Sequence, residues 1–137
     1  MNKNLLCTIF AALTATISVN AQTARSTFAV PFGFQTATVS MPAGEYHIEK
    51  VNWCVLRIAT ADGKRAVMLQ TAGATATDQS GVAKLIFNRY GAKYFLKEYR
   101  PSDSSGMALP PGRSEKEMVA TAARPESTIL MASRITK

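Results

Sequence analysis

Hydrophobic and polar residues alternate along the chain, starting with the segment STFAVPFGF. Phe28, Val30, Phe32 and Phe34 occupy every second position there. Strict alternation is typical of a strand with one buried face. Pro31 has the opposite parity and no backbone N–H to donate, so it predicts an edge strand or a bulge.

The segment EYHIEKV continues the alternation. Tyr46 and Ile48 share one face, whereas Glu45, His47 and Glu49 share the other. A turn at MPAG, with its proline and glycine, precedes this segment. We therefore expect a second strand that buries Tyr46 and Ile48.

The clearest local signal is Asp62-Gly63, which stands between the alternating runs of CVLRIATADGKRAVMLQT. This dipeptide is typical of a two-residue type I′ hairpin turn, in which both central residues have positive φ. We expect the Cys54 side chain to point inward. The register predicts three pairs on the core face: Ile58 with Val67, Leu56 with Leu69, and Cys54 with Thr71.

A second hairpin is predicted in LIFNRYGAKYFLKEYR, with a type II′ turn at Gly91-Ala92. A two-residue loop places Phe87 opposite Leu96 in the core, and a three-residue loop would shift these partners. The second face of the hairpin is predicted to be basic and aromatic, and it carries Lys84, Tyr90, Lys93, Lys97 and Tyr99.

The remaining segments predict loops, one helix and a last strand. Residues 72–81 are small and polar, and residues 101–112 are rich in Pro, Gly and Ser, so both are expected to be loops. Ser114 and Glu117 form a capping-box pattern at the start of a short helix, which Arg124-Pro125 should end. STILMASRI is expected to form the final strand. The fold class is therefore all-β, a small antiparallel barrel or sandwich of about seven strands with one short C-terminal helix.

The first 21 residues match a secretory signal peptide. Lys3 precedes an apolar run from Leu5 to Val19, and Ala21 provides a small residue at the cleavage point. The run is too short and too rich in Thr and Ser for a membrane span. We therefore expect a secreted or periplasmic product in which residues 22–137 form a single β-rich domain without a transmembrane span.

Positive charge is concentrated on the second hairpin. Loss of Lys3 with the leader leaves 15 cationic and 9 acidic residues, and five of the cations lie between Lys84 and Arg100. Such a balance favours an anionic polymer or a lipid head group, and export disfavours nucleic acid. Tyr90 and Tyr99 would serve as stacking platforms beside the lysines. The alternative is that the lysines only prevent edge-to-edge aggregation of strands.

The segments FAVPFGF, MPAGEYHIE, LIFNRYGAKYFLKEY and LPPGRSEKE occur in this order between Phe28 and about Glu117. Together they resemble a family of small secreted bacterial proteins of unknown function with VPFxF, PAGxY and YFL motifs. The resemblance implies export and a β-rich domain. It implies no activity and no functional residues.

Few residues are suited to catalysis or metal binding. His47 is the only histidine, and Cys54 is the only cysteine outside the leader. Glu45, His47 and Glu49 share a strand face but span about 13 Å, which is too long for one ion. The sequence therefore predicts no catalytic residue, no metal site and no cofactor.

The leading hypothesis is a non-enzymatic secreted or periplasmic module that binds an envelope protein or an anionic polymer through the basic hairpin. The first alternative is a small β-barrel that binds an apolar ligand. The second is an enzyme of unrecognised type, which would need a cleft with convergent polar groups.

Overall fold

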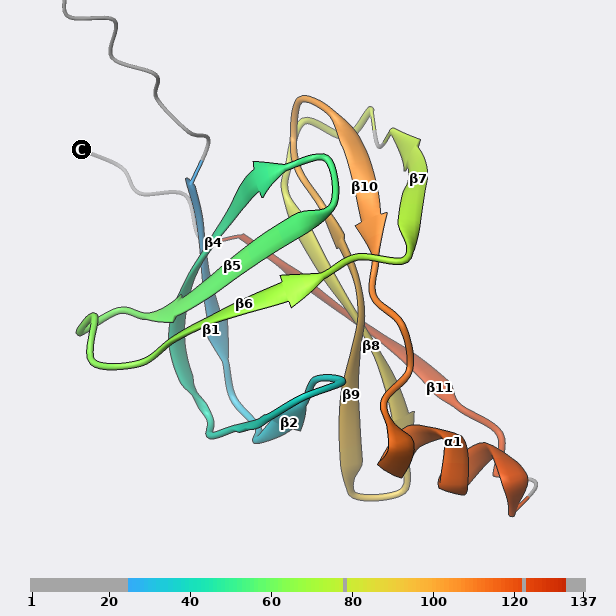
Figure 1. Cartoon of the computed structure of the whole chain (residues 1–137). Coiled ribbons are helices and arrows are strands. Elements are labelled where there is room, and N and C mark those ends of the chain that lie inside the picture. Colours follow the sequence, from blue (N-terminus) through green and yellow to red (C-terminus); the bar gives the residue numbers. More distant parts are fainter. Residues whose placement is uncertain (1–24, 78, 122, 133–137) are drawn as a thin grey trace, which may run out of the picture.

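Two β-sheets pack face to face in this computed structural model, which describes residues 25–77, 79–121 and 123–132 (Figure 1). Sheet A contains four strands in the order β1-β4-β5-β6. Their bounds are Arg25–Val30 (β1), Gly44–Asn52 (β4), Val55–Thr60 (β5) and Ala66–Gln70 (β6). Every neighbouring pair in this sheet is antiparallel.

Sheet B follows the order β11-β8-β9-β10-β7, again with antiparallel neighbours. Its strands are Gly73–Thr77 (β7), Lys84–Tyr90 (β8), Lys93–Arg100 (β9), Ser105–Ala108 (β10) and Glu126–Met131 (β11). Two short strands, Phe34–Gln35 (β2) and Ser40–Met41 (β3), pair with each other, and β2 also pairs with β9. The helix α1 spans Arg113–Ala120 and lies beside the turn between β8 and β9 (Figure 1).

This arrangement confirms the all-β fold class. The sheets do not close on themselves, so the fold is a sandwich and not a barrel. The hydrophobic core lies between the inner faces of the two sheets. The largest side chains buried there are Phe28, Phe34, Tyr46, Phe87 and Tyr99.

The alternating segments bury the residues that the sequence predicts. Phe28, Val30 and Phe34 are buried, and Phe32 packs against the same core. Pro31 directly follows β1, which is an edge strand of sheet A. The proline therefore ends the strand where no neighbour needs its missing N–H.

The β5–β6 hairpin has the predicted register, with Ile58 opposite Val67 and Leu56 opposite Leu69. Its loop is longer than the predicted two residues. Two backbone hydrogen bonds close it, one from the Thr60 N–H to the Arg65 carbonyl (2.8 Å) and one from the Gly63 N–H to the Thr60 carbonyl (2.9 Å). Gly63 has a φ of +72°, which glycine adopts without steric cost.

Cys54 lies in the turn between β4 and β5, where it is half-buried. The Thr71 N–H donates to its carbonyl, as the predicted pairing requires. Its thiol, however, donates to the Asn52 Oδ1 (3.2 Å) at the end of the sheet. The expectation that the side chain points into the core is therefore wrong, because the strand ends before Cys54.

Two segments expected to be loops are strands. β7 and β10 pair with each other, and β10 also pairs with β9 through Met107 opposite Tyr99. Only Met107 and Gly106 of these strands are buried, so neither segment has a strong hydrophobic pattern. β10 forms a strand by pairing with β9, and β7 by pairing with β10, because tertiary context can override weak local propensity.

The β8–β9 hairpin follows the predicted register only near its turn. Gly91 has a φ of +62°, and Asn88 lies opposite Phe95 and Phe87 opposite Leu96. A β-bulge then shifts the register. Beyond it, Ile86 lies opposite Glu98 and Leu85 opposite Tyr99, so Lys97 is the extra residue.

The prediction that Tyr99 lies on the outer face is wrong, because of the bulge. With one extra residue, Tyr99 turns into the core, where it is fully buried and contacts Phe28 edge to face. Its hydroxyl hydrogen-bonds the Ser26 hydroxyl (3.0 Å). Tyr99 is therefore not on the outer face of sheet B, and it is not available for stacking on a ligand at the surface.

The helix begins two residues earlier than the capping box predicts, and it does not use that cap. Its N-cap is Gly112, which makes no side-chain hydrogen bond, and Ser114 already lies within the helix. A Cβ on Gly112 would lie 2.9 Å from the Ala37 Cα. Close packing against the backbone at Ala37 therefore excludes a Ser, Thr or Asp cap at position 112.

The predicted signal peptide, residues 1–21, lies outside the described residues. Within the described part of the chain, no helix has the length and hydrophobicity needed to cross a membrane.

The buried position of Tyr99 can be tested by truncation. We expect Tyr99→Ala to lower the free energy of unfolding by about 3–5 kcal/mol, as for other buried aromatic side chains. Lys97→Ala, next to it in the bulge but exposed, should change it by no more than about 0.5 kcal/mol. Urea denaturation of both variants measures this, and a small effect of Tyr99→Ala would contradict the bulged register.

Candidate functional site

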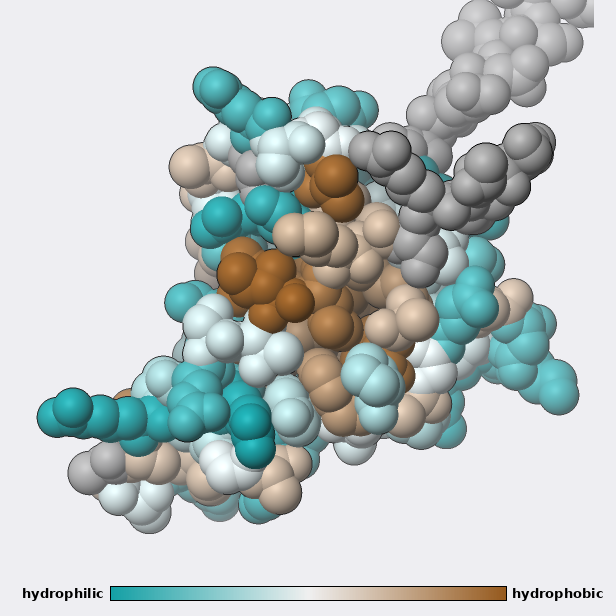
Figure 2. Space-filling model, turned by 180° about the vertical axis from the view of Figure 1, so that it is seen from behind, coloured by the Kyte–Doolittle hydropathy of each residue, from teal (hydrophilic) through white to brown (hydrophobic). Residues whose placement is uncertain are grey.

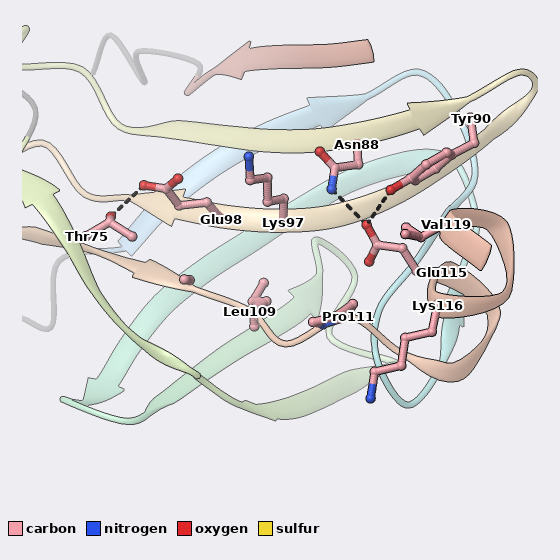
Figure 3. A pocket seen from close by; sticks show the side chains of 11 residues that line it. Thr75, Asn88, Tyr90, Lys97, Glu98, Leu109, Pro111, Glu115, Lys116 and Val119 are labelled. Atoms are coloured by element: carbon pink, nitrogen blue, oxygen red, sulfur yellow. Dashed lines mark hydrogen bonds between the residues drawn. The ribbon is translucent and has the colours of Figure 1, made fainter. Parts of the chain in front are cut away.

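A groove of about 470 Å³ lies on the outer face of sheet B, beside α1 (Figure 3). Asn88 and Tyr90 reach it from β8, and Lys97 and Glu98 from β9. The helix and the chain after β10 complete the walls, with Leu109, Pro111, Glu115, Lys116 and Val119.

The structure brings only two of the five predicted site residues into this groove, Tyr90 and Lys97. Lys93 is exposed beside the hairpin turn, and Lys84 is half-buried at the other end of β8. The two lie about 20 Å apart along the hairpin, at roughly 3.3 Å per residue. With Tyr99 in the core, the five residues do not form one continuous basic and aromatic face. Binding of an anionic polymer through the lysines alone remains a prediction.

Tyr90 is buried under α1 and is only 4% exposed. Its ring packs edge to face against Phe95, and its hydroxyl donates a hydrogen bond to Glu115 Oε1 (3.5 Å). Burial raises the pKa of Tyr90, and the negative charge of Glu115 and the hydrogen bond to it raise this pKa further. Tyr90 is therefore a neutral hydrogen-bond donor at physiological pH.

Glu115 is the third residue of α1 and is only 5% exposed. The Asn88 side-chain amide donates to its Oε1 (2.8 Å), the same oxygen that Tyr90 contacts. The first turn of a helix favours a negative charge, because the free N–H groups there carry partial positive charge. The hydrogen bonds and the helix together hold this carboxylate at the floor of the groove.

Glu98 is the second buried carboxylate of the groove, and it is 6% exposed. It accepts hydrogen bonds from Arg100 Nε (2.6 Å) and Nη2 (3.3 Å), and from the Thr75 hydroxyl (2.5 Å). Burial alone would raise the pKa of Glu98, but the hydrogen bonds from Arg100 and Thr75 and the positive charge of Arg100 lower it below its usual value. Glu98 is thus an ionised carboxylate with its own counterion.

Gly106 of β10 provides the space that this network needs. A Cβ at this position would overlap the Thr75 hydroxyl, and would lie 3.1 Å from Glu98 Oε1 and 3.0 Å from the Arg100 Cγ. The backbone of β10 can approach Glu98 closely only because residue 106 has no side chain.

Apolar surface continues beyond the groove. Val119 is 55% exposed on α1, and Ile129 and Met131 are 54% and 63% exposed on the edge strand β11. Ile129 pairs with Ile86 on the outer face of sheet B. Seen from behind, hydrophobic side chains gather in the middle of the molecule (Figure 2).

The residues that the sequence singled out for possible chemistry lie elsewhere. His47 is on sheet A, where its Nδ1 hydrogen-bonds the Thr27 hydroxyl (3.0 Å), and Cys54 is in the β4–β5 turn. No group of three or more His, Cys, Asp or Glu residues in the described segments is placed to hold a metal ion. The groove instead combines apolar walls with a few hydrogen-bonded polar groups, which is the composition of a small-ligand site.

Sequence reasoning missed Glu115, Asn88 and Thr75 because their positions depend on how α1 and β7 pack. The sequence does contain one indication of the site, at Glu98. In an unbulged hairpin its side chain would share the core face with Phe87 and Leu96, and a charged residue there is costly. That conflict favours a bulge.

Comparison with known proteins gives no relative: no protein-family model, no curated protein and no solved structure matches this chain.

The pH dependence of stability tests the environment of Glu98. Because its pKa is lower in the folded state than the value of about 4.3 in the unfolded chain, its ionised form stabilises the fold above that pH. This stabilisation is lost as the pH falls through the folded-state pKa. We expect Glu98→Gln to lower the free energy of unfolding by about 1–3 kcal/mol at pH 7.

The difference in the free energy of unfolding between wild type and Glu98→Gln should become smaller as the pH falls below about 4. Urea denaturation at several pH values measures this difference. Glu117→Gln is the matched control, because Glu117 is exposed and forms an ion pair with the exposed Arg113. If the difference for Glu98→Gln is constant with pH, or grows at low pH, the pKa of Glu98 is not lowered in the folded state.

Gly106→Ala tests the space around the same carboxylate. We expect it to lower the free energy of unfolding by about 1–3 kcal/mol, because the new methyl group forces Thr75 or Arg100 to move. Gly44→Ala is the control, since a Cβ there would meet no atom within 4 Å. It should be neutral or stabilise by up to about 1 kcal/mol. Equal thermal denaturation midpoints for the two variants would show that Gly106 is not needed for packing.

Proposed function

We propose that this chain is a non-enzymatic secreted or periplasmic binding module, and that the groove beside α1 holds a small ligand with an apolar part. The observation that carries the proposal is the lining of the groove. Apolar side chains of Leu109, Pro111 and Val119 surround a small number of buried polar groups.

The dimensions of the groove support a small ligand. Its volume of about 470 Å³ falls within the range of roughly 300–1,000 Å³ that is typical of such sites. The core between the sheets, in contrast, is filled by large aromatic side chains such as Phe34 and Phe87, whose ring centroids lie 5.4 Å apart. The apolar-ligand hypothesis therefore moves from a barrel interior to the outer face of sheet B.

The polar groups of the groove favour binding over chemistry. Glu98 is paired with Arg100 and Thr75, and Tyr90 and Asn88 both donate to Glu115. Groups fixed in this way orient a ligand without rearranging. Export of the protein, predicted from the leader, would place the groove in the cell envelope or outside the cell.

A neutral fluorescent probe tests the proposal. N-phenyl-1-naphthylamine emits more strongly when it moves from water to an apolar site, and we expect saturable enhancement with the wild-type protein. Val119→Gln should weaken binding about fivefold, since it removes about 1 kcal/mol of apolar contact.

Val51→Gln is the matched control. Val51 is 46% exposed, close to the 55% of Val119, but it lies on β4 and does not line the groove. It should leave binding of the probe unchanged. Enhancement that does not saturate, or an equal loss in both valine variants, would rule out the groove as the site.

A further inference from the structure

We propose that the ligand of the groove carries a cationic amine on an apolar body, and that the carboxylate of Glu115 binds the amine. This inference rests on the proposed function, because it names the chemical class of ligand for the same groove. It follows from a difference between the two buried carboxylates.

Within the part of the chain that the structure describes, Glu98 has a counterion and Glu115 has none. Arg100 donates to both oxygens of Glu98. The Glu115 carboxylate, in contrast, accepts from just two donors of the described segments, the neutral groups of Asn88 and Tyr90. Among the described residues, no Lys or Arg nitrogen lies within 4.0 Å of the Glu115 carboxylate.

The two oxygens of Glu115 also differ. Both neutral donors bind Oε1, and no hydrogen bond from the described part of the protein reaches Oε2. In Figure 3 the second oxygen points away from Asn88 and Tyr90, toward the side of the groove where Leu109 and Pro111 lie. It is therefore a carboxylate acceptor that a ligand can reach.

A buried carboxylate is costly unless a charge or several donors compensate it. The first turn of α1 and the two neutral donors compensate Glu115 only in part. An ammonium group in the groove would add a charge-assisted hydrogen bond, which is stronger than one between neutral groups. Charge complementarity at the floor thus favours a cation.

The walls define the rest of the ligand. Val119 follows Glu115 by four residues on α1, so both side chains lie on one face of the helix. Leu109 and Pro111 lie across from them. An amine bound to Glu115 Oε2 would therefore lay an alkyl or aromatic body along Val119 and Leu109.

Two lysines also line the groove. Lys97 and Lys116 are exposed, and long lysine side chains keep their ammonium groups hydrated. Water screens their attraction for an anion, whereas an interaction at the buried floor is screened much less. An anionic probe tests whether the exposed lysines or the buried Glu115 carboxylate determine which charge the groove prefers.

Three linear probes with eight carbon atoms each differ in the charge of the head group: octylammonium, 1-octanol and octanoate. With the full-length protein at pH 7, isothermal titration calorimetry should give a Kd about tenfold lower for octylammonium than for 1-octanol. Octanoate should bind more weakly than either. This comparison uses only the wild-type protein.

Glu115→Gln should remove the preference for octylammonium and leave the affinity for 1-octanol nearly unchanged. Glu117→Gln, which makes the same change at an exposed glutamate of α1 that does not line the groove, should keep the preference. Glu115→Asp retains the charge and provides a second variant if Glu115→Gln fails to fold. It should keep part of the preference.

The outcomes separate the two proposals. Equal affinity for octylammonium and 1-octanol in the wild type would overturn the cationic ligand but leave the groove as an apolar binding site. Tightest binding of octanoate would assign recognition to Lys97 and Lys116 instead, and would also overturn the inference. No saturable binding of any probe would overturn both proposals.

Discussion

The β-bulge at Lys97 is the feature on which the rest of sheet B depends. One extra residue in β9 reverses the facing of every later side chain in that strand. Tyr99 thereby enters the core and hydrogen-bonds Ser26 of β1, which links the two sheets. Glu98 leaves the core for the outer face, where it lines the groove next to Lys97. Without the bulge, a carboxylate would face the core aromatics and a tyrosine would face solvent.

The outer face of sheet B is built around buried carboxylates, and close backbone packing makes this possible. Gly106 lets β10 pass beside Glu98, and Gly112 lets the start of α1 pack against the turn at Ala37. Each glycine replaces a side chain that would hold the covering element away from the sheet. The elements that form the groove are therefore positioned by two residues that contribute no side-chain contact.

Much of the sandwich was predictable from alternation, because burying one face of a strand imposes a period of two on the sequence. Phe28 to Phe34, Tyr46 and Ile48, and the Leu56–Leu69 pair all lie as predicted. The site was less predictable. A bulge interrupts the period without a consistent residue type. β10 is a strand through its pairing with β9, and β7 through its pairing with β10. Glu115 reaches the groove through the packing of α1. One residue of the sequence does indicate the bulge, because regular pairing would have placed the charge of Glu98 in the core.

The two glutamates of the groove separate what stability requires from what recognition requires. The ionised form of Glu98 stabilises the fold, because Arg100 and Thr75 are arranged to bind it. At position 115 an amide oxygen could accept the same hydrogen bonds from Asn88 and Tyr90, and it would avoid the cost of burying a charge. The hydrogen bonds of the described residues therefore give no reason for a carboxylate there, and the first turn of α1 gives only a partial one. A cation that enters the groove from outside does give one, because it would pair with the oxygen that Asn88 and Tyr90 leave free.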